Sequence, residues 1–346
     1  MLAGQHYVKT KPLTGSILRG RQQYECFFHE RPDFQELFPT IPPGDITKLP
    51  PEAVPSHDIL LAGFPCQPFS LAGVSKKKSL GRPHGFDDPT QGTLFFNVKE
   101  IIRAKQPRAF LLENVKNLQR HDGGRTFRVI RDTLENELGY VITHRIIDAQ
   151  GWVPQHRERI FIVGYHPDCC IAEQEIEFPR PPKTRPSLGK LILKSASEQY
   201  TLGPGTWKTL VRHKAHHARA GNGFGYGLIA RPFRPGQVTR TISARYHKDG
   251  AEVLIDQPGG VRPRRLTPLE CARLMGFPEE YTRYFDPTQK DFRQPVSDTQ
   301  AYRQFGNSVV VPVVAAIAKA MIMLLDEKGV ESVSIKGPRV LTLPTG

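Results

Sequence analysis

The stretch Asp58-Ile-Leu-Leu-Ala-Gly-Phe-Pro-Cys-Gln-Pro-Phe-Ser70 decides the fold that we predict for this chain. Ile59 to Ala62 have the uninterrupted apolar pattern of a buried strand, and Gly63 and Pro65 then turn the chain. Ligands collect at the carboxyl ends of the strands of an open α/β sheet, which is where this pattern places Cys66. We interpret the Cys66 thiol as a nucleophile. The alternative is a buried structural cysteine, since free cysteines are commonly buried.

The segments that follow complete a βαβ unit. Thr93 to Lys105 has the apolar spacing of a helix, and Ala109-Phe-Leu-Leu-Glu113 has the pattern of a second buried strand. A right-handed crossover would place Cys66 and Glu113 at the ends of neighbouring parallel strands. An acid that ends an apolar strand is costly to bury without a partner, which favours a functional Glu113 over a solvated one.

Two more strands are predicted after a helix over Thr126 to Leu138, namely Tyr140 to Ile147 and Arg159 to Gly164. The residues between these strands form a hairpin in this interpretation and carry Arg157 and Arg159. Because alternate residues of a strand share a face, both arginines are expected to point the same way, and one to reach the active pocket. The alternative is a surface strand edge protected by charges.

The composition changes after the last of these strands. Residues 166–186 are Pro-rich and irregular, which indicates a domain boundary. Residues 170–262 are predicted to form short strands and loops, and their mixture of Gly, aromatic and Arg residues suits loops that enter a nucleic-acid groove. We interpret His213, His216 and His217 as solvated or phosphate-contacting rather than metal-binding, because no matching Cys or carboxylate set accompanies them.

Regular structure returns near residue 264. The run Thr267-Pro268-Leu-Glu270 is typical of a helix start, with a threonine cap, proline at the first position and a glutamate that completes a capping box. An apolar helix over roughly Ser308 to Leu325 should pack on the sheet. Gly306-Asn307-Ser308 would place backbone amides and an Asn side chain at the start of that helix, a suitable place for a polar ligand.

Composition limits the class of protein. The chain has 346 residues, enough for a sizeable core, and it contains neither a run of eighteen apolar residues nor a signal segment, so a soluble, cytoplasmic protein with no membrane contact is expected. Five cysteines without a C-x-x-C pair argue against a disulfide framework and a metal site. The net charge of +14 indicates a polyanionic partner. Ribosomal, RNA-binding and acidic-ligand proteins share that property, so charge alone does not choose among them.

Five motifs occur in an order that resembles the DNA cytosine-5 methyltransferases, most closely the bacterial Dcm type. They are Gly63-Phe-Pro-Cys-Gln-Pro-Phe-Ser70, Glu113-Asn114-Val115, Gln155-His-Arg-Glu-Arg159, Arg265-Leu-Thr-Pro-Leu-Glu-Cys-Ala-Arg-Leu-Met-Gly276 and Phe305-Gly-Asn-Ser-Val309. The resemblance implies an α/β fold: a Rossmann-like S-adenosylmethionine-dependent methyltransferase domain with an inserted small target-recognition domain. It divides the chain into a catalytic domain over 1–168, a target-recognition domain over 169–263 and a C-terminal part over 264–346 that returns to the catalytic domain.

The resemblance also implies an activity, methyl transfer to C5 of a cytosine that is flipped out of a short, specific duplex DNA sequence. In this family a thiolate first adds to C6, and Cys66 matches that nucleophile. Glu113 would hydrogen-bond N3 and the exocyclic amine, Arg159 would hold O2, and Arg157 would support the pocket or contact a phosphate. Residues 71–90, which charge alone leaves as either a lid or a solvated loop, resemble the loop that closes over the flipped base.

The methyl donor that the resemblance implies is S-adenosylmethionine. The matching positions are Gly4, Glu25, Asp45, Ile46, Gly63, Pro65, Leu94, Asn307 and Val309. At the N-terminus only Leu2-Ala3-Gly4 resembles the family's Phe-x-Gly-x-Gly-Gly loop, and Glu25 has the distance, but not the neighbours, of the acid that binds the ribose. A local reading-frame error or a late start is our hypothesis for this departure. If these residues are genuine, a reduced cofactor affinity is expected.

The expected partners are double-stranded DNA and, as a further candidate, a cognate restriction endonuclease, and the enzyme is expected to act as a monomer. Resemblance to the Dcm type suggests a CCWGG-like recognition site. The alternative function is that of a decayed or cofactor-impaired relative that acts only as a DNA-binding protein. An unrelated cysteine hydrolase is disfavoured, because Cys66 lacks a convincing His-Asn pair.

Overall fold

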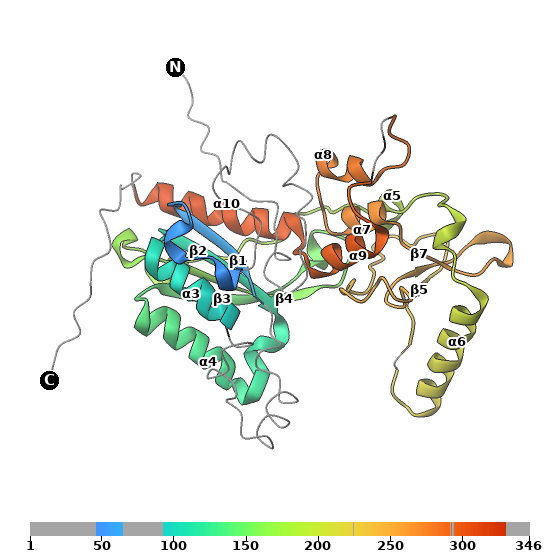
Figure 1. Ribbon diagram of the computed structural model, residues 1–346, viewed down its shortest axis with the longest axis horizontal. Helices are drawn as coiled ribbons and strands as arrows, with labels where there is room; N and C mark the ends of the chain where they lie inside the picture. Colours follow the sequence, from blue (N-terminus) through green and yellow to red (C-terminus); the bar gives the residue numbers. More distant parts are fainter. Residues whose placement is uncertain (1–45, 65–92, 224, 291, 293, 330–346) are drawn as a thin grey trace. The chain divides into compact units, whose positions relative to one another are not determined.

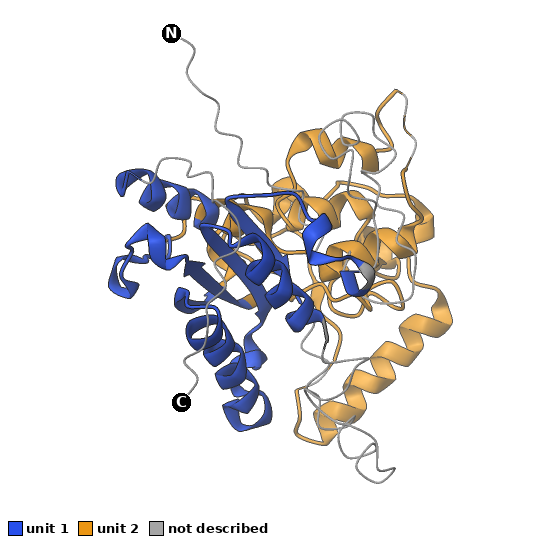
Figure 2. Cartoon of the chain, turned by 60° about the vertical axis from the view of Figure 1, so that its left-hand side comes forward, with its two compact units in different colours: residues 1–147, 159–179, 317–346 blue, residues 148–158, 180–316 orange. Residues whose placement is uncertain are grey.

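The computed structural model describes residues 46–64, 93–223, 225–290, 292 and 294–329 (Figure 1). The chain divides into two compact units, which Figure 2 colours separately. Unit 1 is Met1–Ile147, Arg159–Pro179 and Ile317–Gly346, and unit 2 is Asp148–Glu158 and Arg180–Ala316. These units group residues by contact, so they differ from the three functional segments expected from sequence, and that functional division stays a prediction.

Unit 1 is built on a four-stranded sheet with the order β1-β2-β4-β3. The strands are β1 (Ile59–Gly63), β2 (Ala109–Val115), β3 (Val141–Asp148) and β4 (Glu158–Tyr165). β1 and β2 run parallel with Gly63 opposite Glu113, and α3 (Thr93–Lys105) lies between them in sequence. The predicted βαβ unit is therefore confirmed. β4 joins β2 in the antiparallel direction, so the sheet is mixed.

An apolar core covers one face of this sheet. α3 and α4 (Arg125–Asp132) supply one half of the core, and alternate residues of β2 and β4 supply the other half. Its buried members include Phe95, Val98, Ile102, Phe110, Leu112, Phe127, Ile130, Ile160 and Ile162. Tyr165 points to the other face, where its hydroxyl donates to the Met321 carbonyl of α10 (Val311–Glu327) at 3.3 Å. Figure 1 accordingly shows α10 across the sheet from α4.

Unit 2 has little strand and more helix. A small sheet has the order β5-β6-β7, formed by Leu228–Ile229, Leu254–Ile255 and Arg264–Arg265. The helices are α5 (Leu188–Leu191), α6 (Pro204–Arg219), α7 (Pro268–Leu274), α8 (Glu279–Thr282) and α9 (Asp298–Asn307), followed by the first residues of α10. The prediction of short strands and loops over 170–262 is wrong for α6. Only a narrow apolar stripe of that helix is buried, so the helical period is weak in the sequence.

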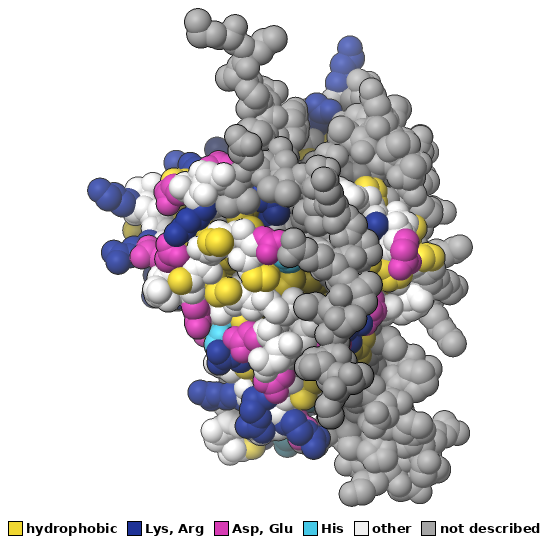
Figure 3. Space-filling model, turned by 90° about the vertical axis from the view of Figure 1, so that its left-hand side faces the viewer, with side chains coloured by type: hydrophobic (Ala, Val, Ile, Leu, Met, Phe, Trp, Pro, Cys, Tyr) yellow, Lys and Arg dark blue, Asp and Glu magenta, His cyan; other side chains and the backbone are white. Residues whose placement is uncertain are grey.

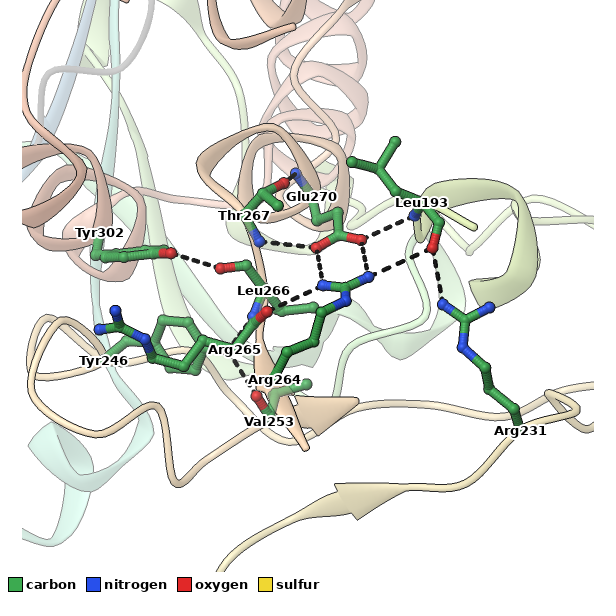
Figure 4. A network of polar contacts seen from close by, with 10 residues as sticks. All are labelled: Leu193, Arg231, Tyr246, Val253, Arg264, Arg265, Leu266, Thr267, Glu270 and Tyr302. Atoms are coloured by element: carbon green, nitrogen blue, oxygen red, sulfur yellow. Dashed lines mark hydrogen bonds and ion pairs between the residues drawn. The ribbon is translucent and has the colours of Figure 1, made fainter. Parts of the chain in front are cut away.

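The predicted start of α7 is confirmed and belongs to a buried polar network (Figure 4). Thr267 caps the helix by accepting from the Glu270 amide at 3.2 Å, and the Glu270 carboxylate accepts from the Thr267 amide at 2.7 Å. Both Glu270 oxygens also accept from Arg264, each at 2.8 Å. The Leu193 amide donates to the same carboxylate at 2.8 Å. The network therefore ties the start of α7 to β7 and to Leu193, two residues after the end of α5.

The chain between α9 and α10 departs from the prediction. Gly306 and Asn307 are the last two residues of α9, and α10 begins only at Val311. The expected helix start at Ser308 is therefore wrong. Pro312, which suits the first turn of a helix, marks the actual start, and the largely apolar composition of residues 309–325, interrupted only by Lys319, hides the break.

The stretch Asp298–Glu327 has the length and hydropathy of a membrane-spanning segment, with a mean hydropathy of 2.3 in its most apolar window. Half of that window is buried inside the structure. Core helices pass the same test, so the finding is weak evidence for a span, and the expectation of no membrane contact stays a prediction.

Candidate active site

Glu113 and Arg159 form an ion pair at the edge where β1 ends. Arg159 Nε lies 2.9 Å from Glu113 Oε1, and each side chain is 16% exposed. Phe161 lies directly opposite Glu113 in the antiparallel pairing, so Arg159 is the diagonal neighbour of Glu113 and its long side chain reaches across. The pair is half-buried, which strengthens its electrostatics while leaving it within reach of a ligand.

The backbone between β1 and Cys66 is anchored by Asn114. This side chain is 2% exposed, its Nδ2 donates to the Phe64 carbonyl at 2.8 Å, and its Oδ1 accepts from the Val115 amide at 2.8 Å. Phe64 itself is buried and packs against Phe95 with ring centroids 5.4 Å apart. The chain is therefore fixed at the residue two positions before Cys66. We did not single out Asn114 from sequence, although its place directly after Glu113 was a usable signal.

Gly63 lies beside the same carboxylate. A Cβ at this position would lie 3.4 Å from Glu113 Oε2, at the close limit of ordinary van der Waals contact. The predicted parallel pairing of these two strands is confirmed, whereas the predicted closeness of Cys66 and Glu113 stays a prediction, because Cys66 lies outside the described residues.

Two predicted cofactor residues share one apolar cluster in unit 1. Ile46 is 7% exposed within this cluster, and the half-buried Leu94 at the start of α3 packs against it. Both residues therefore belong to the apolar core of unit 1, and their contact with the adenosine part of S-adenosylmethionine stays a prediction.

Arg157 lies in unit 2 and is 2% exposed. Its Nη1 donates to the Ile242 carbonyl at 2.9 Å, and its Nη2 donates to the carbonyls of Gly306 at 3.0 Å and Ser308 at 2.6 Å. The guanidinium thus holds the backbone on both sides of Asn307. Because the Arg157 guanidinium is buried and donates to backbone carbonyls, support of the fold is favoured for Arg157 over contact with a phosphate.

Arg157 and Arg159 have separate partners, and of the two it is Arg159 that pairs with Glu113, so the expectation that both point the same way stays a prediction. β4 begins at Glu158, and strand alternation does not extend to the residue before it. The neighbouring Gln155, which sequence reasoning also missed, is fully buried: its Oε1 accepts from the Ile242 amide at 3.0 Å and its Nε2 donates to the Leu274 carbonyl at 3.2 Å. In the motif Gln155-His-Arg-Glu-Arg159, Gln155 and Arg157 therefore hold the backbone of unit 2, while Arg159 pairs with Glu113 in the sheet of unit 1.

Asn307 and Val309 also belong to unit 2. Asn307 is half-buried at the end of α9, and Val309 is 5% exposed in the short segment before α10. The remaining predicted site residues, Gly4, Glu25, Asp45, Pro65 and Cys66, and the expected closing loop over 71–90, lie outside the described residues.

Three other cysteines can be compared with the predicted nucleophile. Cys169 and Cys271 are buried, and burial raises the pKa of both thiols, that of Cys271 strongly. Cys170 is exposed. A thiol with a raised pKa is a poor source of thiolate, so neither buried cysteine suits nucleophilic catalysis.

The chain matches a family model described as C-5 cytosine-specific DNA methylase over residues 33–323. The chain belongs to this family. The match includes the Glu113–Arg159 pair and the anchoring Asn114, and it begins after Gly4 and Glu25.

Curated relatives agree with this assignment. The chain is 50% identical over 313 residues to the DNA-cytosine methyltransferase of Escherichia coli strain K12, covering 82% of this chain and 63% of that protein. It is 49% identical over 286 residues to the Type II methyltransferase M.SsoII of Shigella sonnei, covering 82% and 69%, respectively. It is 47% identical over 279 residues to M.NlaX of Neisseria lactamica, covering 80% of each chain. The chain thus spans less than two thirds of the length of the Escherichia coli relative.

Solved structures show a similar fold. The methyltransferase EhMeth of Entamoeba histolytica aligns with a TM-score of 0.58 at 17% identity, covering 85% of this chain and 86% of that one. A DNMT2 mutant of Spodoptera frugiperda aligns with a TM-score of 0.56 at 18% identity, covering 84% and 88%. These likenesses confirm the predicted α/β methyltransferase fold.

Proposed function

We propose that this chain transfers a methyl group from S-adenosylmethionine to C5 of a flipped-out cytosine in a short, specific duplex DNA sequence. The observation that carries the proposal is the half-buried Glu113–Arg159 pair at the edge where β1 leads to Cys66. A carboxyl group, when protonated, and a guanidinium side by side match the edge of cytosine, which offers an amine and an acceptor ring nitrogen next to a carbonyl oxygen.

In this mechanism the Cys66 thiolate adds to C6, and the electron pair of the C5–C6 bond makes C5 nucleophilic. Glu113, in its protonated form, donates its proton to N3 and accepts from the exocyclic amine, and Arg159 donates to O2, where negative charge develops. After C5 has gained the methyl group, its proton is lost to a solvent base. The released electron pair reforms the double bond and expels the thiolate, so the enzyme is regenerated.

S-adenosylmethionine, when bound, supplies the methyl group of this reaction. Ile46 and Leu94 would contact its adenine, and Gly63 and Asn307 belong to the same proposed set. Val309 is the last of the proposed cofactor-binding residues that the structure describes. The others are Gly4, Glu25, Asp45 and Pro65, which lie outside the described residues.

The same proposal covers the recognition of the DNA sequence, the partners of the chain and its oligomeric state. Residues 169–263 would recognise the target sequence, and a CCWGG-like site is the first one to test. Because M.SsoII and M.NlaX are named Type II methyltransferases, a cognate restriction endonuclease is a candidate partner of this chain too. We propose a monomeric enzyme of the cytoplasm.

The test is transfer of a tritiated methyl group to duplex DNA that carries candidate sites, with Cys66→Ala as the control. Transfer by the wild type and none by the variant is expected. A second assay uses duplex DNA with 5-fluorocytosine at the target, where the blocked loss of fluorine should trap a covalent complex that depends on Cys66 and on the donor. DNA binding without transfer by the wild type would overturn the proposal in favour of a DNA-binding protein.

A further inference from the structure

Residues 199–248 form an acid-free segment of unit 2. These fifty residues contain no Asp or Glu and nine Lys or Arg, namely Lys208, Arg212, Lys214, Arg219, Arg231, Arg234, Arg240, Arg245 and Lys248. They therefore carry most of the net charge of +14. The face of the molecule in Figure 3 is different, because cationic and acidic side chains are interspersed on it. The positive charge of the chain is thus concentrated in one segment.

α6 lies within this segment and is held to unit 2 by one side only. Leu210 is buried, and Trp207 packs with it against the ring of Tyr226, with ring centroids 4.9 Å apart. Lys214 lies over the same ring, with its Nζ 4.4 Å from the centroid. Leu254 of β6 completes the contact. This side fixes the orientation of the helix, which reaches away from β5 and β7 at the margin of unit 2 (Figure 1).

The opposite side of α6 presents Lys208, Arg212 and Arg219. They occupy positions i, i+4 and i+11, which fall on one face of an α-helix, and at 1.5 Å per residue they are spaced by about 6 Å and about 10 Å along its axis. All three side chains are exposed. Within the part of the chain that the structure describes, none of the three makes an ion pair or a side-chain hydrogen bond.

Other cations of the acid-free segment are engaged within unit 2. Arg231 donates to the Leu193 carbonyl at 2.7 Å, and Arg240 donates to the Gly225 carbonyl at 2.5 Å. These arginines support the fold, whereas the outer face of α6 has no such internal contacts. Three like charges on one face repel each other and lower stability by themselves, so an anionic partner is the simplest reason to keep them.

We propose that the outer face of α6 is a phosphate clamp, which grips the backbone of duplex DNA without reading its sequence. Lysine and arginine side chains are donors only, and the phosphate oxygens of DNA are acceptors only. Such contacts position a protein on the duplex and make its affinity depend on salt. This inference rests on the proposed function, since it takes the same DNA as the ligand, but it assigns to α6 a role separate from base recognition.

The test is the salt dependence of DNA binding by the full chain. The slope of log K against log salt concentration is negative, and the triple variant Lys208→Gln, Arg212→Gln and Arg219→Gln should reduce its magnitude by about 2 to 3, since each lost phosphate contact removes roughly 0.9. Binding to methylatable and unrelated duplexes of equal length should weaken by the same factor. A triple variant that retains the charges, Lys208→Arg, Arg212→Lys and Arg219→Lys, should keep the slope.

A matched control neutralises three exposed cations of unit 1, Arg128, Lys319 and Lys328, and should leave the slope within about 1 of the wild type. An unchanged slope in the α6 variant, or a loss confined to the methylatable duplex, would overturn the clamp. Thermal unfolding by circular dichroism verifies that every variant is folded. If the wild type binds DNA with the expected α6 effect but transfers no methyl group, the clamp stands and the proposed function fails. If methyl transfer is present and the slope does not respond, the clamp alone fails.

Discussion

Two Arg–Glu pairs in this molecule have similar chemistry and different surroundings. Arg264 and Glu270 are 2% and 0% exposed, and each oxygen of Glu270 accepts from both Arg264 and a backbone amide. Arg159 and Glu113 are each 16% exposed and lie at the edge of a sheet. The first pair is buried and saturated by backbone amides, while the second is partly exposed at the edge of its sheet. The same two residue types are thus used once for architecture and once, in our proposal, for chemistry.

The difference follows from where each carboxylate stands. Glu270 lies in the first turn of α7, where unpaired amides and a nearby guanidinium converge on it. Glu113 lies in a strand, whose amides are engaged in the sheet ladder and leave its side chain to find partners elsewhere. Stability should therefore respond to the first pair and catalysis to the second.

The largest expected effect is on catalysis. Glu113→Gln keeps the shape of the side chain but removes its charge, so it should lower kcat for methyl transfer by roughly 10²- to 10⁴-fold. Single-turnover transfer of tritiated methyl groups measures this effect. Urea unfolding should show only a small change, since the pair is not fully buried. A Glu113→Gln variant with near-normal kcat would refute the proposed catalytic role of the Glu113–Arg159 pair.

The second effect is on stability. Glu270→Gln leaves the buried guanidinium of Arg264 without a counter-charge, which should lower the free energy of unfolding by about 3–5 kcal/mol. Urea denaturation of the full chain measures it. The matched control is Glu135→Gln, which breaks an exposed i, i+4 pair with Arg131 and should cost about 0.5 kcal/mol or less. Equal costs for the two variants would show that burial does not distinguish the pairs.

The third expected effect is on stability and on catalysis together. Asn114→Ala leaves the Phe64 carbonyl and the Val115 amide without their side-chain partner, at a cost of about 1–3 kcal/mol. It should also lower kcat, because the chain that enters the Cys66 loop loses its anchor. Asn114→Asp separates the two contacts, since aspartate can accept from Val115 but cannot donate to Phe64. If Asp restored the wild-type kcat, the anchor at Phe64 would not matter for catalysis.

The smallest effect concerns the helix cap within the saturated network. Thr267→Ala removes the acceptor of the Glu270 amide and should cost about 1 kcal/mol, while Thr267→Ser should retain most of the stability. The midpoint of thermal unfolding reports both variants. Methyl transfer per folded molecule should not change, and a specific loss of kcat would mean that α7 contributes to catalysis directly.

The sequence predicted best those features that depend on short-range chemistry. The apolar run that ends at Gly63, the helix over Thr93–Lys105 and the capping box of α7 are all present as expected. Prediction failed where only a few residues of an element are buried. α6 has no continuous apolar stripe beyond Trp207 and Leu210, so its helical period was weak against the surrounding glycines.

The sequence by itself determined the family of this chain, its βαβ unit and the proposed nucleophile in the Gly63-Phe-Pro-Cys66 turn, because these follow from local patterns and ordered motifs. Only the tertiary structure decided which groups each arginine contacts. Arg157 and Arg159 are two residues apart, yet one is buried among the carbonyls of unit 2 and the other pairs with a glutamate of unit 1. Sequence spacing gives neighbours along the chain, whereas burial and hydrogen-bond partners are set by segments that folding brings together.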